Sequence, residues 1–143
     1  MRILGLDVGS KRIGVAMSDP LGIIAQGLTT LQCKNQDSDR ETIVGLIRQY
    51  EVQEIVVGIP YHMNGSEGPE VKKIREFVSV IREAVSLPIH EWDERLSTVA
   101  AERLLIEADM SRKKRRKVVD KVAAVIILQG FLDKRRHEVA SQS

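Results

Sequence analysis

Short apolar runs separated by turn residues fill the first third of the chain. The run from Ile3 to Val8 is followed by Gly9-Ser10-Lys11-Arg12 and then by a second run from Ile13 to Met17. A second turn sequence at 19–22 precedes a weaker third run over 26–31. Runs of this length between Gly, Ser, Asp and Pro residues are typical of strands joined by tight turns. The pattern predicts a three-stranded antiparallel meander.

Helical and strand patterns alternate in the rest of the chain. Apolar positions recur every three or four residues over 43–50 and over 71–85, which predicts two amphipathic helices. We expect Ser38 or Asp39 to cap the first helix and Pro69 to begin the second. The almost continuous apolar run EIVVGIP, residues 54–60, is typical of a parallel strand covered on both faces.

The last part of the chain predicts one more strand and two more helices. The strand runs from Pro88 to Trp92, and the helices span 96–108 and about 118–135, with the basic sequence SRKKRRK between them. Together these elements predict an α/β fold: a mixed five-stranded sheet, an antiparallel meander followed by parallel strands, with helices on both faces. We expect one domain over residues 1–138 and a polar tail at 139–143.

Chemistry-bearing residues follow the predicted strands at one edge of the sheet. Asp7 ends the first strand, Gly58 and Pro60 end the fourth, and Asp93-Glu94 end the fifth. Ligands of such sheets gather outside the carboxyl ends of parallel strands, where the strand order reverses. The layout therefore predicts a functional site at this edge.

Composition and charge narrow the class of protein. Hydrophobic residues make up 43% and charged residues 29% of 143 residues, as in ordinary globular proteins, and the net charge is only +2. The single cysteine, Cys33, excludes an internal disulfide framework and pairs of zinc ligands. No apolar run has the length of a membrane span, and the chain starts directly in a strand, so we expect a cytoplasmic protein.

Asp7 occupies an unusual position in the first predicted strand. Gly5 and Gly9 lie two residues away on either side and share its face. A buried carboxylate costs several kcal/mol unless it is paired, and glycine weakens a strand interior. The sequence LGLDVGS therefore predicts either a cationic partner for Asp7 or a ligand that approaches the backbone closely.

Three acids, remote in sequence, can converge in this layout: Asp7, Asp93 or Glu94, and Asp120. Alternation along HEWDE puts Glu94 on the same face as Trp92 and favours it over Asp93. Asp120 lies near the start of a helix that is apolar nearly all round, although an acid there can also simply complement the helix dipole. Carboxylates without nearby histidines suit Mg²⁺ or Mn²⁺, and two such ions about 4 Å apart hydrolyse phosphodiester bonds.

Four sequence motifs carry a resemblance to a known family. LGLDVGSKRIGVA, EIVVGIPYHMNGSEG, HEWDERLST and VDKVAAVIIL occur in the order expected of the YqgF family, also called the RuvX family. The resemblance implies an RNase H-like fold similar to that of RuvC resolvases and a metal-dependent nuclease that matures the 5′ end of pre-16S ribosomal RNA in ribosome biogenesis. By motif, it assigns the catalytic and metal-binding roles to Asp7, Glu94 and Asp120.

The resemblance leaves the substrate open. RuvC enzymes place an acid on the fourth strand, where this chain has VVGIP. This difference supports nuclease chemistry as such more than resolution of four-way (Holliday) DNA junctions. Precursor rRNA is the substrate that the resemblance implies, and four-way DNA is the alternative. Oligomeric state, monomer or homodimer, stays open.

Several residues are candidates for nucleic-acid binding. Lys11 and Arg12 occupy the turn after Asp7, and Arg95 can contact a phosphate or merely pair with Asp93. The sequence NGSEG, with Asn64, Gly65 and Ser66, precedes a helix, where free backbone N–H groups can bind a phosphate; an ordinary turn with Ser66 as a cap is the alternative.

A basic run lies just before Asp120. It includes Lys113, Lys114, Arg115 and Arg116, and a second basic cluster, Lys134 to Arg136, lies at the far end of the final helix. Six adjacent positive charges repel, so we expect the first run to be mobile unless a polyanion covers it. Aromatic residues are only 3%, so recognition is expected to depend on shape and charge, with Tyr61 as the aromatic best placed to meet a ligand.

Two other classes of function fit parts of the sequence. Actin-like ATPases and sugar kinases also use Asp-x-Gly between strands, but they close two domains on a nucleotide, and this chain has one such motif and room for one domain. A non-catalytic nucleic-acid-binding module on the same fold is the other rival. The retention of all three acids argues against it, since buried carboxylates without a role are replaceable by apolar residues.

Overall fold

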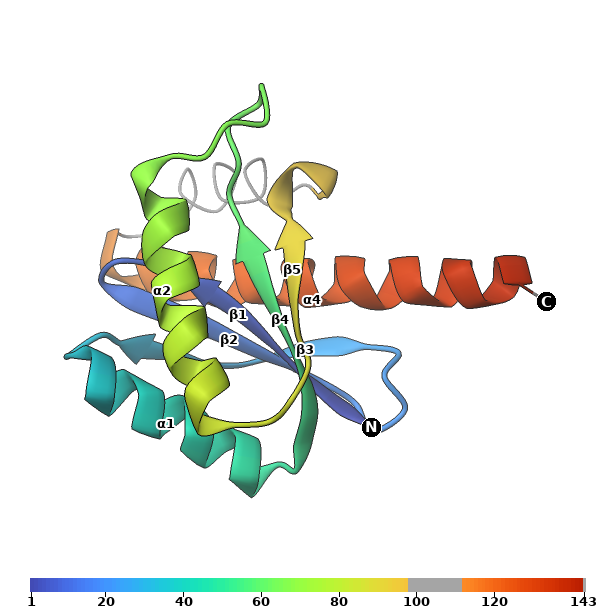
Figure 1. The fold of residues 1–143 in the computed structure, drawn as a ribbon, viewed down its shortest axis with the longest axis horizontal. Helices are drawn as coiled ribbons and strands as arrows, with labels where there is room; N and C mark the ends of the chain where they lie inside the picture. Colours follow the sequence, from blue (N-terminus) through green and yellow to red (C-terminus); the bar gives the residue numbers. More distant parts are fainter. Residues whose placement is uncertain (98–111, 143) are drawn as a thin grey trace.

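A computed structural model describes the backbone of residues 1–97 and 112–142 and the side chains of residues 1–97 and 121–141. Five strands form one mixed sheet in the order β3-β2-β1-β4-β5. β1, β2 and β3 pair antiparallel, whereas β4 and β5 run parallel to β1. This sheet confirms the predicted fold class. In chain order the elements are β1 (Arg2–Val8), β2 (Arg12–Ser18), β3 (Ala25–Gln32), α1 (Gln36–Gln49), β4 (Val52–Ile59), α2 (Pro69–Ala84), β5 (Ile89–Asp93), the 3₁₀ turn η1 (Glu94–Leu96) and α4 (Arg112–Gln142) (Figure 1).

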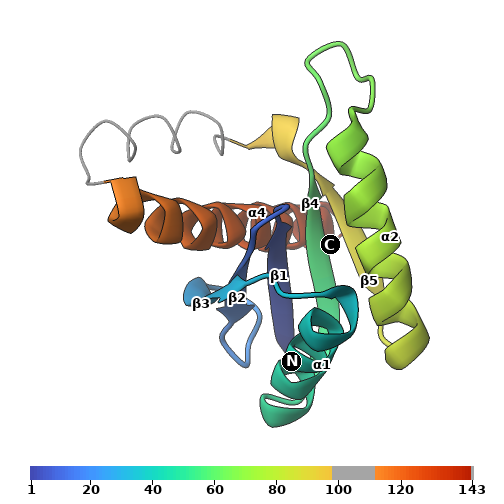
Figure 2. The same ribbon diagram turned by 90° about the vertical axis from the view of Figure 1, so that its left-hand side faces the viewer.

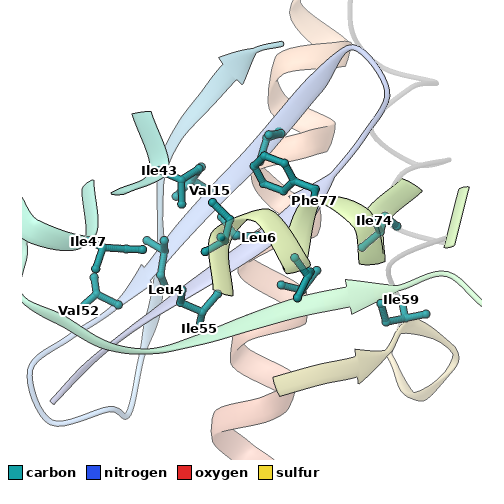
Figure 3. Close-up of a cluster of buried hydrophobic side chains, with 14 of the residues drawn as sticks. Leu4, Leu6, Val15, Ile43, Ile47, Val52, Ile55, Ile59, Ile74 and Phe77 are labelled. Carbon is teal, nitrogen blue, oxygen red and sulfur yellow. The ribbon is translucent and has the colours of Figure 1, made fainter. Parts of the chain in front are cut away.

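Helices cover the two faces of the sheet, with α1 and α2 on one side and α4 on the other (Figure 2). Side chains alternate along β1 accordingly. Leu4 and Leu6 pack with residues of α1 and α2, including Ile43 and Phe77, in the larger apolar core (Figure 3). Ile3 belongs to the smaller core beneath α4. Alternation therefore decides which side chains of β1 and β4 face α4.

α4 crosses the strands rather than running along them (Figure 1). Its residue Lys121 lies against Gly27 of β3, and Gly130 lies against Trp92 of β5. Between these points a Cβ atom on Gly5 of β1 would lie 2.7 Å from Cβ of Leu128. The helix therefore fits this closely only because glycines stand beneath it.

Two boundaries differ from the sequence prediction. The cap of α1 is Asn35, whose side-chain oxygen accepts from the Ser38 N–H at 2.8 Å, rather than Ser38 or Asp39. α4 already includes Arg112 and continues to Gln142, so the basic run and most of the expected polar tail are helical. Lys and Arg are good helix formers, and successive side chains point in different directions around a helix, which separates like charges.

The helix expected over 96–108 lies mainly outside the described residues, apart from the short turn η1 at its start. Of the helices described, none carries an apolar stretch sufficient to cross a membrane.

Candidate active site

The carboxyl ends of β1, β4 and β5 meet at one edge of the sheet, as the sequence predicted. These three strands are parallel neighbours. Asp7 is the next-to-last residue of β1, Gly58 is the next-to-last residue of β4, and Glu94 follows β5 directly. The acids at 7 and 94 therefore come to the same edge from strands that are far apart in the sequence.

Asp7 lies on the face of the sheet that α4 covers. Alternation gives it the same orientation as Ile3, which packs in the core beneath α4, and as Gly5, which contacts Leu128. Only 9% of Asp7 is exposed. The carboxylate is thus held on a rigid strand, largely shielded from bulk water, close to where α4 crosses the sheet.

Space beside Asp7 comes from glycines on the neighbouring strands. Gly14 of β2 pairs directly with Asp7. On the other side Leu6 pairs with Val57, so that Gly58 is the next residue along β4. Asp7 therefore has a residue without a side chain next to it on both adjacent strands.

The expectation that Gly5 and Gly9 make room for a ligand is wrong. The open side of Gly5 is filled by Leu128, so this glycine serves helix packing. Gly9 donates its N–H to the carbonyl oxygen of Arg12 at 2.9 Å, and a Cβ atom there would lie 2.7 Å from the same oxygen. Gly9 therefore serves the tight turn between β1 and β2.

Glu94 reaches over Gly58. Its Oε2 atom lies 3.2 Å from the position that a Cβ atom on Gly58 would occupy. The same Cβ position is 2.4 Å from Cδ1 of Ile127 in α4, which shows that Glu94 lies on the α4 face, as Asp7 does. Both carboxylates therefore lie beside Gly58 on the face of the sheet that α4 covers.

Asp93 is bound instead by Arg95. The Arg95 Nη2 atom donates to Oδ2 of Asp93 at 2.7 Å, and Nε lies 3.1 Å from Oδ1. The Arg95 backbone N–H also donates to Oδ1 at 2.9 Å. These hydrogen bonds lower the pKa of Asp93. Of the two roles considered for Arg95, pairing with Asp93 is therefore the one that the structure contains.

The third predicted acid, Asp120, lies in α4, and its side chain is outside the described residues. It precedes Ala124 by one helical turn, and the carbonyl oxygen of Ala124 lies 3.2 Å from the Cβ position of Gly5. The backbone path thus brings α4 to β1 within one turn of Asp120. Among the described side chains there is no complete group of three potential metal ligands.

For the loop between β4 and α2, the sequence left a phosphate site and an ordinary turn as alternatives, and the structure contains a turn. The Gly65 N–H donates to the carbonyl oxygen of His62 at 2.8 Å, and the Ser66 N–H donates to Oδ1 of Asn64 at 2.9 Å. Both N–H groups are thus used within the turn, in which Gly65 has a φ of +88°. Ser66 is not the helix cap either, because α2 is preceded by Gly68, which makes no side-chain cap.

The basic candidates lie near the same edge or on α4. Lys11 is exposed on the turn that follows β1, next to Arg12 at the start of β2. The helical backbone of α4 carries Lys113, Lys114, Arg115 and Arg116 in its first turns, ahead of Asp120, and their side chains are outside the described residues.

Comparison with known proteins identifies the family. The sequence model described as "RuvX: Holliday junction resolvase" matches residues 1–134. The chain belongs to the RuvX family. A protein of Clostridium kluyveri, named as a pre-16S rRNA nuclease, is 55% identical over 134 residues, which cover 94% of this chain and 98% of that protein. A Moorella thermoacetica protein of the same name is 56% identical over 134 residues, which cover 94% of this chain and 96% of that protein. Membership of this family makes the chain a nuclease.

Solved structures confirm the fold of this RuvX protein. RuvC of Thermus thermophilus in complex with a Holliday junction aligns with a TM-score of 0.61 at 11% identity, covering 95% of this chain and 96% of that one. The fowlpox virus Holliday junction resolvase aligns with a TM-score of 0.54 at 12% identity, covering 94% and 99%. The RNase H-like architecture of the resolvases is therefore shared.

Two residues of the RuvX site were not singled out from the sequence. Gly14 lies in the predicted second strand, and its sequence RIGVA gives no hint that it pairs with Asp7. Arg75 lies in the middle of α2, and its Nη2 atom donates to the hydroxyl of Tyr61 in the loop after β4. No feature of the sequence pointed toward either contact, because both depend on the register and packing of whole elements.

Proposed function

We propose that this RuvX protein is a divalent-metal-dependent nuclease whose catalytic and metal-binding residues are Asp7, Glu94 and Asp120, and that its substrate is precursor 16S rRNA in the cytoplasm. The observation that carries the proposal is the placement of Asp7 and Glu94 beside Gly58, on one face of the sheet. Membership of the RuvX family and the names of its close relatives support the reaction class.

The donor set fits Mg²⁺ or Mn²⁺. Both described members are carboxylates, which are the oxygen ligands that these hard cations prefer, and the nearby β4 position is a glycine that leaves room for them. Two carboxylates at one place repel, so a cation between them lowers the cost of keeping both ionised. When bound, such ions activate water for attack on phosphorus and stabilise the departing 3′ oxygen.

The chain itself supplies rigidity and a place for the substrate. Asp7 is fixed by strand pairing on both sides, and α4 closes the face above it. Exposed Lys11, in the turn after β1, and the basic first turns of α4 offer positive charge for the phosphate backbone. Such contacts position a nucleic acid without reading its sequence.

Precursor rRNA is preferred over a DNA junction because of the fourth strand. RuvC enzymes are expected to carry an acid on this strand, at the position where this chain has VVGIP. In this chain the described carboxylate of β4 that faces α4 is Glu54, at the opposite end of the strand. Glu54 is engaged by Arg135 and His90. The edge of the sheet thus differs from the RuvC pattern at this position.

The deciding experiment compares wild type with Asp7→Asn. Cleavage of precursor 16S rRNA, single-stranded RNA and four-way DNA junctions is measured with Mn²⁺ and with EDTA. We expect Mn²⁺-dependent cleavage of the precursor by wild type, and a loss of at least about 1,000-fold in Asp7→Asn with folding and RNA affinity retained. The exposed acid Asp37 provides the control variant Asp37→Asn, which is expected to cleave normally.

Wild-type cleavage by Asp7→Asn would refute the catalytic assignment. Preferential cutting of the four-way junction would make resolution the activity of this chain and remove the rRNA proposal. Sedimentation of the protein with and without the preferred substrate decides between monomer and homodimer, which a two-fold symmetric junction would require.

A further inference from the structure

We propose that Arg95 is a positioning residue: by binding Asp93 and stacking on Tyr61, it holds Glu94 and the β4–α2 loop (residues 60–68) in one fixed arrangement. The inference rests on the proposed function, in which Glu94 is a metal ligand. It assigns Arg95 no contact with the reacting atoms.

The first contact fixes the chain on either side of Glu94. Asp93 and Arg95 flank Glu94, and their side chains are joined by hydrogen bonds of 2.7 to 3.2 Å from Nη2 and Nε. The Asp93 carboxylate also accepts from the Arg95 backbone N–H, which starts η1. With its two neighbours tied together in this way, Glu94 extends on the other side, over Gly58.

The second contact joins this turn to the loop after β4. The Arg95 guanidinium carbon lies 5.3 Å from the centre of the Tyr61 ring, within the range of a cation–π interaction. Its Nη1 atom is 3.5 Å from the carbonyl oxygen of Met63, and a Cβ atom on Gly65 would lie 3.4 Å from Nη1. The guanidinium therefore lies between η1 and the loop and contacts both.

Tyr61 is fixed from its other end by a second arginine. Nη2 of Arg75 donates to the Tyr61 hydroxyl at 3.1 Å. Arg75 also donates to Glu91 of β5 at 3.1 and 3.2 Å, and to Glu67 of the loop at 2.5 Å. The Tyr61 side chain also packs against the larger apolar core. Tyr61, which the sequence marks as the aromatic best placed to meet a ligand, is thus also an anchor of the loop.

The contacts of Arg95 are expected to affect the orientation of Glu94 more than the stability of the fold. Arg95 and Asp93 are 34% and 23% exposed, and ion pairs at such positions contribute about 0–1 kcal/mol to folding. Glu94 is the first residue of η1, which has only three residues, and lies directly between Asp93 and Arg95. Groups that orient metal ligands typically change metal affinity or activity by about 10–100-fold when removed.

The experiment uses two variants of Arg95 and two of Tyr61, with three readouts. Arg95→Gln removes the charge and the forked hydrogen bonds, whereas Arg95→Lys keeps the charge alone. Tyr61→Leu removes the ring that Arg95 covers, whereas Tyr61→Phe keeps the ring and loses only the bond to Arg75. Mn²⁺ binding without nucleic acid is measured by calorimetry, kcat and KM are measured on the cleaved RNA, and Tm is measured by thermal unfolding.

We expect Arg95→Gln and Tyr61→Leu to weaken Mn²⁺ binding and to lower kcat by about 10–100-fold, with KM and Tm nearly unchanged. Arg95→Lys is expected to retain more Mn²⁺ affinity and a higher kcat than Arg95→Gln. Tyr61→Phe is expected to do the same relative to Tyr61→Leu. Arg40→Gln, which removes a half-buried arginine that pairs with Asp37 on α1, is the matched control and is expected to change neither Mn²⁺ affinity nor kcat.

Wild-type Mn²⁺ binding and kcat in Arg95→Gln would overturn the inference. A raised KM with unchanged Mn²⁺ binding would also overturn it, because Arg95 would then be a substrate contact. Failure of the proposed function is distinguished by Asp7→Asn: if that variant binds Mn²⁺ and cleaves RNA normally, the metal site itself is misassigned, whatever Arg95 does.

Discussion

Two buried carboxylates of equal exposure have different surroundings in this protein. Asp7 and Glu54 are each 9% exposed and both face α4. Arg135 forms two hydrogen bonds with Glu54, at 2.7 and 2.9 Å, and His90 lies 2.9 Å from the same carboxylate. Glu54 is thus a structural link between β4 and α4. What distinguishes Asp7 is its place at the carboxyl edge, with Gly14 and Gly58 beside it.

Gly58→Ala tests the role of the glycine beneath Glu94. The new Cβ would lie 2.4 Å from Cδ1 of Ile127 and 3.2 Å from Oε2 of Glu94, so both α4 and the acid must shift. We expect a loss of about 1–3 kcal/mol in the free energy of unfolding, together with lower nuclease activity at a temperature where the variant is folded.

Gly45→Ala is the matched control for this substitution, because a Cβ atom on Gly45 would meet nothing within 4 Å. In the middle of α1 the change is expected to stabilise the protein by about 0.5–1 kcal/mol and to leave activity unchanged. Equal effects of the two substitutions would show that the space over Gly58 has no special role.

At the scale of the element, α4 contributes to three parts of the molecule. Its first turns carry the basic run, its middle covers Gly5 and Gly58, and its later turns bind Glu54. Gln129 further fixes it to the β2–β3 turn, donating to the carbonyl oxygen of Ile23 and accepting from the Ala25 N–H. The Glu54–Arg135 ion pair, the Gln129 hydrogen bonds and the apolar core beneath α4 together hold this helix in place.

The Glu54–Arg135 pair predicts a pH dependence of stability. The hydrogen bonds from Arg135 lower the pKa of Glu54 below its ordinary value of 4.5. A carboxylate with a lowered folded-state pKa stabilises the fold above its unfolded pKa, and this contribution is lost as the pH falls through the folded-state pKa. In denaturant titrations, Glu54→Gln should therefore cost about 1–3 kcal/mol at pH 7 and show a shallower loss of stability below pH about 4.5. Parallel pH profiles of wild type and variant would contradict this role for Glu54.

The basic run of α4 predicts a salt effect on nucleic-acid binding. Neutral replacements at Lys113, Lys114, Arg115 and Arg116 should weaken binding and reduce the slope of log K against log salt concentration by up to about 3, since each phosphate contact adds roughly 0.7–0.9. As a control of equal charge, exposed residues elsewhere are neutralised: Lys72, Lys73, Arg82 and Lys134. An unchanged slope in the first variant would exclude the run from the binding surface.

At the scale of the whole molecule, the sheet brings distant residues together. Asp7 and Glu94 are separated by most of the chain, yet β1, β4 and β5 are parallel neighbours that end at one edge. Each crossover between parallel strands passes through a helix on the face opposite α4 (Figure 2). In the part of the chain that the structure describes, the α4 face is thereby left to the acids and to α4.

A metal site at this edge predicts stabilisation of the whole fold by divalent ions. Binding to the folded state alone contributes about 2.7 kcal/mol when the ion is present at 100 times its Kd, which corresponds to a rise in Tm of roughly 5–10 °C for a chain of this size. We expect Mn²⁺ to raise the Tm of wild type, measured at constant ionic strength with NaCl, and to raise that of Asp7→Asn much less. An equal rise in both proteins would place the bound ion elsewhere.

The sequence by itself determined the elements and their order. Apolar periodicity and turn residues are local properties, so the meander, the parallel strands and the second amphipathic helix could be predicted close to their observed bounds, whereas α4 extends beyond its predicted range at both ends. The rule that parallel strands present ligands at their carboxyl ends predicted that Asp7 and Glu94 come to one edge, and alternation along HEWDE put Glu94 on the face of Trp92. The RuvX resemblance rested on the same four stretches of sequence.

Only the tertiary structure decided which residues are neighbours within that edge. Strand register, rather than sequence spacing, put Gly14 and Gly58 beside Asp7, and the crossing of α4 assigned Gly5 to helix packing. The partners of Glu54 and Tyr61 come from helices far along the chain. Such contacts depend on how whole elements pack against each other, and no local pattern of residues encodes that packing.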